Sequence, residues 1–98
     1  MAKLTAPQNP RYKLEISKKA RKGRADLPKA KQRAVNQIIQ EYLAVNPLDR
    51  LPGKTKVLHG RYKGILQYNV DDKYRIHYTV DRQNMIVYID FIGPHPEW

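Results

Sequence analysis

Cysteine is absent from this chain of 98 residues, and histidine occurs only three times. Without cysteine there is neither a disulfide nor a thiolate ligand for zinc, and a chain without disulfides suits a reducing compartment. His59, His77 and His95 do not form the H-E-x-x-H spacing of a catalytic zinc site. The sequence therefore predicts a protein that holds no metal ion and uses no cofactor.

Long apolar runs are missing as well. No segment approaches the roughly 18 apolar residues that cross a membrane. The first ten residues, with Pro7 and Pro10, lack the unbroken apolar stretch of a secretory signal. We therefore expect a cytoplasmic protein that does not contact a membrane, in which residues 1–10 form a flexible arm and residues 11–98 a single domain.

Acidic side chains are scarce, because nine Asp and Glu stand against nineteen Lys and Arg and leave a net charge of +10. Such an excess attracts polyanions such as nucleic acid, an anionic membrane surface or an acidic protein. A charged surface that only keeps a small protein soluble is the alternative. The densest basic run comprises Lys18, Lys19, Arg21, Lys22, Arg24, Lys29, Lys31 and Arg33. It is interpreted either as a solvated helix face or as a patch for RNA backbone.

The first half of the sequence predicts two helices. Ser17 can cap a short basic helix of one or two turns through its hydroxyl, before Gly23 and Pro28 interrupt it. A longer helix begins at Asp26 or Pro28, carries an apolar stripe at helical spacing and ends at Asn46, which precedes a proline.

Alternating apolar segments predict four strands, at residues 11–16, 62–70, 74–80 and 85–92. Residues 48–58 contain a Pro-Gly pair and are interpreted as a loop leading into the second strand. Short turns make the last three strands antiparallel neighbours, because parallel strands need a long crossover. The order βααβββ predicts an α+β fold, a single domain with a mostly antiparallel four-stranded sheet and two helices packed on it.

Three motifs in the carboxyl half are spaced as in a known family. They read L-H-G-R-Y-K-G at residues 58–64, K-Y-R-I-H-Y at 73–78 and F-I-G-P-H at 91–95. Together they resemble the RelE/ParE superfamily of bacterial toxins. The segment Tyr62-Lys63-Gly64 and the tail His95-Pro96-Glu97-Trp98 most resemble the mRNA interferases YafQ, RelE and YoeB.

This resemblance implies a RelE-like fold and the toxin of a type II toxin–antitoxin system. Such a toxin is a metal-independent endoribonuclease that cuts mRNA on the ribosome, inhibits translation and arrests growth. It implies as partners mRNA, ribosomal RNA and a cognate antitoxin that silences the toxin in a hetero-oligomer. Two alternatives remain open, a ParE-like inhibitor of DNA gyrase and a basic RNA-binding module without catalysis.

Metal-free RNA cleavage needs a base for the 2′-hydroxyl, an acid for the 5′-oxygen and cations around the transition state. By resemblance, Arg75 contacts the scissile phosphate and His95 transfers a proton, as general acid to the leaving oxygen. Lys56 falls where some relatives have a glutamate or histidine base. A lysine with the usual pKa of about 10.4 is protonated at neutral pH, so Lys56 is assigned first as a cation and only second as a base. The alternatives are surface roles, such as an ion pair of Arg75 with Asp71 or Asp72.

Further RNA contacts are predicted from four cations and two aromatic rings. The set comprises Lys54, Arg61, Lys63 and Lys73 for phosphates, with Tyr62 and Trp98 as stacking platforms for bases. Packing of Tyr62 in the core is the alternative for that ring. His77 follows Arg75 by two residues and shares its strand face, although a structural role suits it better.

Overall fold

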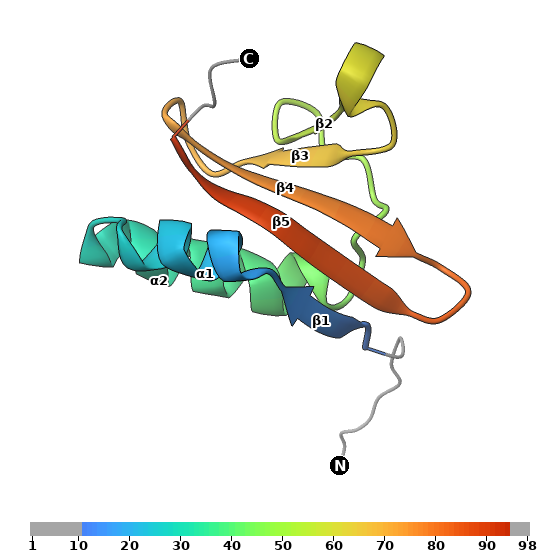
Figure 1. The fold of residues 1–98 in the computed structure, drawn as a ribbon, viewed down its shortest axis with the longest axis horizontal. Helices are drawn as coiled ribbons and strands as arrows, with labels where there is room; N and C mark the ends of the chain where they lie inside the picture. The colour runs from blue at the N-terminus through green and yellow to red at the C-terminus, as the bar shows by residue number, and fades with distance from the viewer. Residues whose placement is uncertain (1–10, 95–98) are drawn as a thin grey trace.

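Residues 11–94 are described by a computed structural model of the protein, so the predicted arm at 1–10 and the tail at 95–98 lie outside the described residues. The elements are β1 (Lys13–Ile16), α1 (Lys18–Ala25), α2 (Lys29–Ile38), a π-helical turn η2 (Ile39–Leu43), β2 (Thr55–Val57), a 3₁₀ turn η3 (Gly60–Tyr62), β3 (Leu66–Asn69), β4 (Tyr74–Asp81) and β5 (Ile86–Pro94). Both helices lie on one side of the sheet (Figure 1). The α+β class predicted from the sequence is confirmed.

The sheet has the strand order β1-β5-β4-β3-β2. β1 pairs parallel with β5, and the three other pairs are antiparallel. The crossover that a parallel pair requires runs from β1 through both helices and three further strands to β5. The first strand therefore lies beside the last one, and the sheet is mostly antiparallel, as predicted.

The prediction of four strands is wrong by one strand. Residues 55–57, assigned to a loop, form the short edge strand β2, which exists because it pairs with β3 from Thr55–Tyr68 to Val57–Leu66. The predicted strand at 62–70 begins only at Leu66. Gly60 and Gly64 have φ values of 67° and 92°, in the left-handed region that strands do not use, and the chain turns through η3 between them.

The two helices follow the predicted pattern with two exceptions, of which the first is that the helix predicted to end at Asn46 is α-helical only to Ile38 and continues as η2 to Leu43. Ser17 caps α1, and its Oγ accepts a hydrogen bond from the backbone N–H of Ala20 at 3.0 Å. Pro28 precedes α2, as its fixed φ favours. Gly23, however, lies within α1 and does not interrupt it. A side chain at this position would meet the carbonyl of Ile92, so glycine allows α1 to approach β5 closely.

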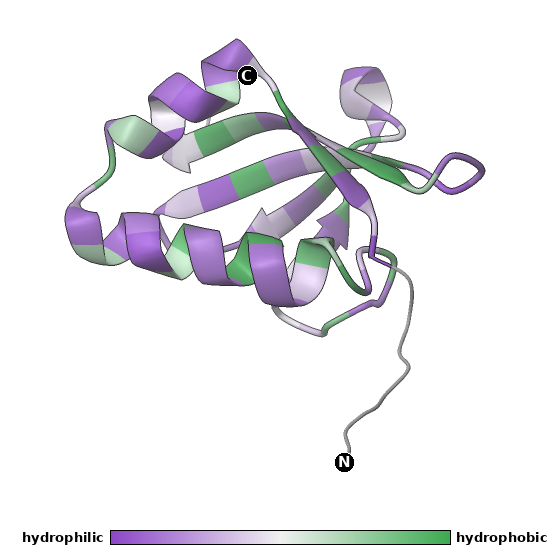
Figure 2. Ribbon diagram, turned by 90° about the horizontal axis from the view of Figure 1, so that it is seen from below, coloured by the Kyte–Doolittle hydropathy of each residue, from purple (hydrophilic) through white to green (hydrophobic). Residues whose placement is uncertain are grey.

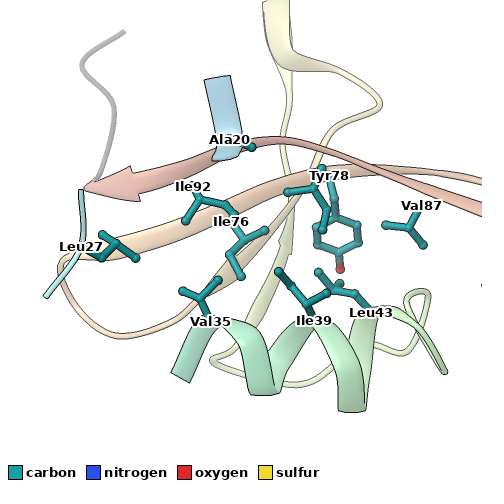
Figure 3. Close-up of a cluster of buried hydrophobic side chains, with 10 residues drawn as sticks. Ala20, Leu27, Val35, Ile39, Leu43, Ile76, Tyr78, Val87 and Ile92 are labelled. Carbon is teal, nitrogen blue, oxygen red and sulfur yellow. The ribbon is translucent and has the colours of Figure 1, made fainter. Parts of the chain in front are cut away.

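The core lies between α2 with η2 and the inner face of the sheet. Val35, Ile39 and Leu43 point from the helix toward Ile76 and Tyr78 of β4 (Figure 3). Burying side chains of this size stabilises a fold by about 1.5–3 kcal/mol each. Along α2, hydrophobic and hydrophilic residues alternate, whereas α1 is hydrophilic over most of its length (Figure 2).

An extra residue in β5 shifts its register against β4. His77 pairs with Phe91 and Tyr78 with Ile89, so Asp90 has no partner residue on β4. This β-bulge lets Ile89 and Ile92, three residues apart, both face the core. It also places Phe91 on the opposite face, beside His77.

Candidate functional site

The face of the sheet that is turned away from the core carries most of the chemically interesting side chains. Leu66, Tyr68, Ile76 and Tyr78 pack in or against the core, and side chains alternate along a strand. Their neighbours in sequence therefore point to the other side. We call this side the outer face and define it by Lys56, Gln67, Asn69, Arg75, His77 and Phe91.

Two rows of partner residues cross the outer face. One row joins Lys56 of β2 to Gln67, His77 and Phe91. The other joins Asn69 to Arg75 and Gly93. Directly opposed side chains in such rows are about 4.5–5.5 Å apart at Cβ. Lys56 and Arg75, predicted as site residues from the sequence, thus lie on the same face in adjacent rows.

Arg75 is half-buried and has no carboxylate partner among residues 11–94. Its Nη1 donates to the carbonyl oxygen of Asp71 and, at 3.2 Å, to that of Tyr74. Its Nε is buried without a hydrogen-bond partner in the described part of the chain. The ion pair with Asp71, considered above as the alternative, does not form. Within residues 11–94, no carboxylate therefore compensates the positive charge of the guanidinium on the outer face.

The carboxylate of Asp71 is occupied by other groups. It pairs with Lys31 of α2 and accepts hydrogen bonds from the backbone N–H groups of Lys73 and Tyr74, each at 2.8 Å. The Lys31 ammonium, followed by these N–H groups, lowers the pKa of Asp71 to about 2. This network fixes the β3–β4 turn, whose carbonyl groups hold Arg75.

Lys54 and Lys56 approach the outer face from the edge strand. The side chains of both lysines are exposed, and Lys56 stands opposite Gln67. The carbonyl oxygen of Lys54 accepts a hydrogen bond from the N–H of Asn69 at 2.7 Å. Because Asn69 is the partner of Arg75 on β4, the backbone of Lys54 continues the row that contains Arg75.

The loop cations lie elsewhere. Arg61, Tyr62 and Lys63 belong to or follow η3, at the end of the β2–β3 pair that is opposite Lys54 and Asn69. The guanidinium of Arg61 lies 5.9 Å from the centre of the Tyr62 ring. Tyr62 is half-buried. These three residues therefore form a separate group at the far end of the hairpin.

Lys73 lies at the border of a groove beside the outer face. The groove has a volume of about 450 Å³ and is formed by α1, the start of β4 and the end of β5. Lys19 and Lys22 of α1 also line it, so part of the basic run identified in the sequence contributes. The ammonium groups of Lys19 and Lys73 stand over the rings of Phe91 and Tyr74, at 5.5 and 5.4 Å.

The predicted residues His95 and Trp98 lie outside the described residues. The last described residue, Pro94, pairs with Tyr74, and Gly93 pairs with Arg75. The described chain therefore ends beside Arg75. Within residues 11–94, no group of three His, Cys, Asp or Glu side chains could hold a metal ion, and no helix there is long and apolar enough to span a membrane.

Sequence analysis missed two polar residues of the outer face, Gln67 and Asn69. His77 Nε2 is 2.9 Å from Gln67 Oε1, and Gln67 Nε2 donates to Asn69 Oδ1 at 2.9 Å. Both residues belong to β3, whose first predicted residue was four positions too early. The available signal was the alternation of Gln67 and Asn69 with the apolar Leu66 and Tyr68.

No protein-family model and no curated protein matches the sequence, but solved structures do. A chain of the RelBE2 toxin–antitoxin complex from Mycobacterium tuberculosis has a TM-score of 0.72 at 22% identity, covering 87% of this chain and 99% of that one. A chain of the archaeal RelE–RelB complex from Pyrococcus horikoshii has a TM-score of 0.70 at 24% identity, with coverages of 89% and 98%. A YafQ mutant from E. coli has a TM-score of 0.59 at 15% identity, with coverages of 86% and 93%. This chain therefore has the fold of the RelE/ParE superfamily of toxins.

Proposed function

We propose that this protein is the toxin of a type II toxin–antitoxin system and an endoribonuclease that cuts mRNA without a metal ion. The observation that carries the proposal is the placement of Lys56 and Arg75 on one face, with Arg75 free of any described carboxylate. The strand spacing and rise put their Cα atoms roughly 12 Å apart. The exposed side chain of Lys56 can extend across this span toward a phosphate that Arg75 binds.

Arg75 suits the scissile phosphate because both of its hydrogen bonds within residues 11–94 use Nη1. The Nη2 donors are left for a ligand, and the charge persists at every relevant pH. The two carbonyl contacts fix the guanidinium in advance, so little reorganisation is needed when negative charge develops.

In the proposed reaction, the 2′-oxygen of the ribose forms a bond to phosphorus while the bond from phosphorus to the 5′-oxygen breaks. A 2′,3′-cyclic phosphate and a 5′-hydroxyl result. Arg75 and Lys56 stabilise the charge on the non-bridging oxygens, and His95 gives the leaving oxygen its proton. The 2′ proton passes to water; in the alternative, the Lys56 amine accepts it and Arg75 alone stabilises the charge on the non-bridging oxygens.

The charge of +10 supports a polyanionic substrate, and Lys54, Lys73 and the lysines of α1 extend the cationic surface beyond the reacting phosphate. We place the protein in the cytoplasm, where ribosomes present mRNA. The solved structures that this chain resembles include toxin–antitoxin complexes. We infer that this chain also has a cognate antitoxin, an acidic or amphipathic segment that folds as it covers the basic surface.

The test incubates purified protein with translating ribosomes and maps the 5′ ends of a defined message. The wild type should cut within codons. Arg75→Ala should lower the cleavage rate by about 100-fold, as the loss of one transition-state donor does. His95→Ala should lower it by at least about 100-fold through loss of the acid. Arg82→Ala is the matched control, because Arg82 is exposed in the turn at the opposite end of β4.

Each alternative predicts a different result. DNA-damage signalling in expressing cells without cut messages would replace the proposal by inhibition of DNA gyrase. Salt-sensitive RNA binding without cuts would leave a binding module. Full activity of both the Arg75→Ala and the His95→Ala variants would refute the site assignment.

A further inference from the structure

The outer face contains a hydrogen-bonded row of three polar side chains, two of which are almost fully buried. Gln67 and His77 each expose only 4% of their surface. His77 Nε2 and Gln67 Oε1 are 2.9 Å apart, and Gln67 Nε2 continues the row to Asn69 Oδ1 at the same distance. Each buried polar group here has a partner, which offsets the cost of removing it from water.

This row has a defined direction. The amide oxygen of Gln67 only accepts, so the Nε2 of His77 carries the hydrogen. The amide nitrogen of Gln67 then donates onward to Asn69. On its other side, the imidazole of His77 contacts the ring of Phe91, with 5.3 Å between centres and a tilt of 47°. His77 is therefore held from both sides, by a hydrogen bond and by an aromatic ring.

The row lies between the two cations of the proposed site, Lys56 and Arg75. Gln67 is the partner of Lys56 on β2, and Asn69 is the partner of Arg75 on β4. The neutral amides fill the space between the cations without offering a carboxylate that would compete with a phosphate. Lys19 stands over the face of the same Phe91 ring, so the packing reaches α1.

We propose that His77 is a positioning residue, which fixes Gln67 and Asn69 and thereby the surface on which Lys56 and Arg75 approach one phosphate. This inference rests on the proposed nuclease function. A site that gains rate from fixed geometry loses rate when its supporting side chains loosen. The row does not touch the substrate, so its loss should lower kcat and leave substrate binding largely unchanged.

The test measures kcat and KM for RNA cleavage in four variants. His77→Phe keeps a ring against Phe91 but cannot donate, and Gln67→Leu breaks the same hydrogen bond from β3. Each should lower kcat about tenfold, the rate equivalent of one hydrogen bond, with KM changed by less than about twofold. His77→Gln restores a donor and should recover most of kcat. Thr79→Val is the matched control on the same face of β4, outside the row.

The outcomes separate the two proposals. A wild type that cuts no RNA would overturn the nuclease function and the role of His77 together. A wild type that cuts, with kcat unchanged in His77→Phe and Gln67→Leu, would overturn only the role of the row. Equal losses in His77→Phe and His77→Gln, or in Thr79→Val, would also count against it, because they would indicate general damage to the sheet. Thermal unfolding of each variant shows whether it is folded at the assay temperature.

Discussion

The close contact between α1 and β5 depends on the absence of a side chain at Gly23. A Cβ at this position would lie 1.9 Å from the carbonyl oxygen of Ile92 and 3.1 Å from its carbon. A carbon and an oxygen pack comfortably near about 3.4 Å, so Gly23→Ala requires α1 to move away by roughly 1.5 Å. Both atoms belong to the backbone of a paired strand, and no flexible side chain can give way instead.

The size of the effect follows from two opposing contributions. Forcing an additional group into a packed contact costs up to about 3 kcal/mol, and the shift would also withdraw the fully buried Ala20 from the core. Alanine within a helix returns about 1 kcal/mol relative to glycine. We therefore expect Gly23→Ala to lower the free energy of unfolding by about 2 kcal/mol, or the Tm by about 8–16 °C at this chain length.

Urea unfolding followed by circular dichroism measures this change. Lys18→Ala is the control, because Lys18 is an exposed residue of the same helix and should change the free energy of unfolding by less than about 0.5 kcal/mol. If Gly23→Ala were as stable as the wild type or more stable, helix propensity would dominate, and the close approach of α1 to Ile92 would be refuted.

Two further predictions concern the loops that flank the outer face. Asp71→Asn should lower the free energy of unfolding by about 1–2 kcal/mol at pH 7. It should also reduce the wild-type loss of stability as pH falls from 3.8 toward about 2, because Lys31 stabilises the ionised carboxylate only in the folded protein. Urea titrations at pH 2, 4 and 7 test both expectations, and equal curves for variant and wild type would contradict the ion pair. Tyr78→Phe should cost about 1 kcal/mol, because the buried hydroxyl donates to the Pro47 carbonyl at 3.2 Å. Burial also raises the pKa of Tyr78. The wild type should therefore lose stability above about pH 10, because the Tyr78 hydroxyl ionises more readily in the unfolded chain. Thermal unfolding at pH 7 and about 10.5 should show a smaller loss of stability in Tyr78→Phe than in the wild type.

Local signals in the sequence were sufficient for much of the fold. Ser17 as a cap, the apolar stripe of α2 and the alternation in β4 each depend on residues close in sequence, and each predicted element is present. β2 has no such signal, because three residues form a strand only when β3 lies beside them. The role of Gly23 depends in the same way on Ile92, which is distant in sequence.

The candidate site was likewise predictable where it depends on local motifs and not where it depends on the pairing of strands. Motif resemblance selected Arg75, and Lys56 followed from its spacing to the first motif. That they share a face depends on register, which is a property of paired strands. Gln67 and Asn69 belong to no motif, and the bulge at Asp90, which brings Phe91 to His77, interrupts the alternation from which faces are inferred.

The two faces of this small sheet have separate physical tasks. The inner face buries Ile76, Tyr78 and their neighbours and accounts for most of the stability that a domain of this size can gain from its core. On the outer face, an apolar pair in place of Gln67 and His77 would fill the same space without the need to satisfy polar groups. A domain of this size has little stability to spare, yet it buries polar side chains between two cations. The geometry that those cations need explains this row better than the stability of the fold does. Substitutions in the row and substitutions of the two cations should therefore both lower the rate of RNA cleavage, while the packing of the inner face keeps these variants folded.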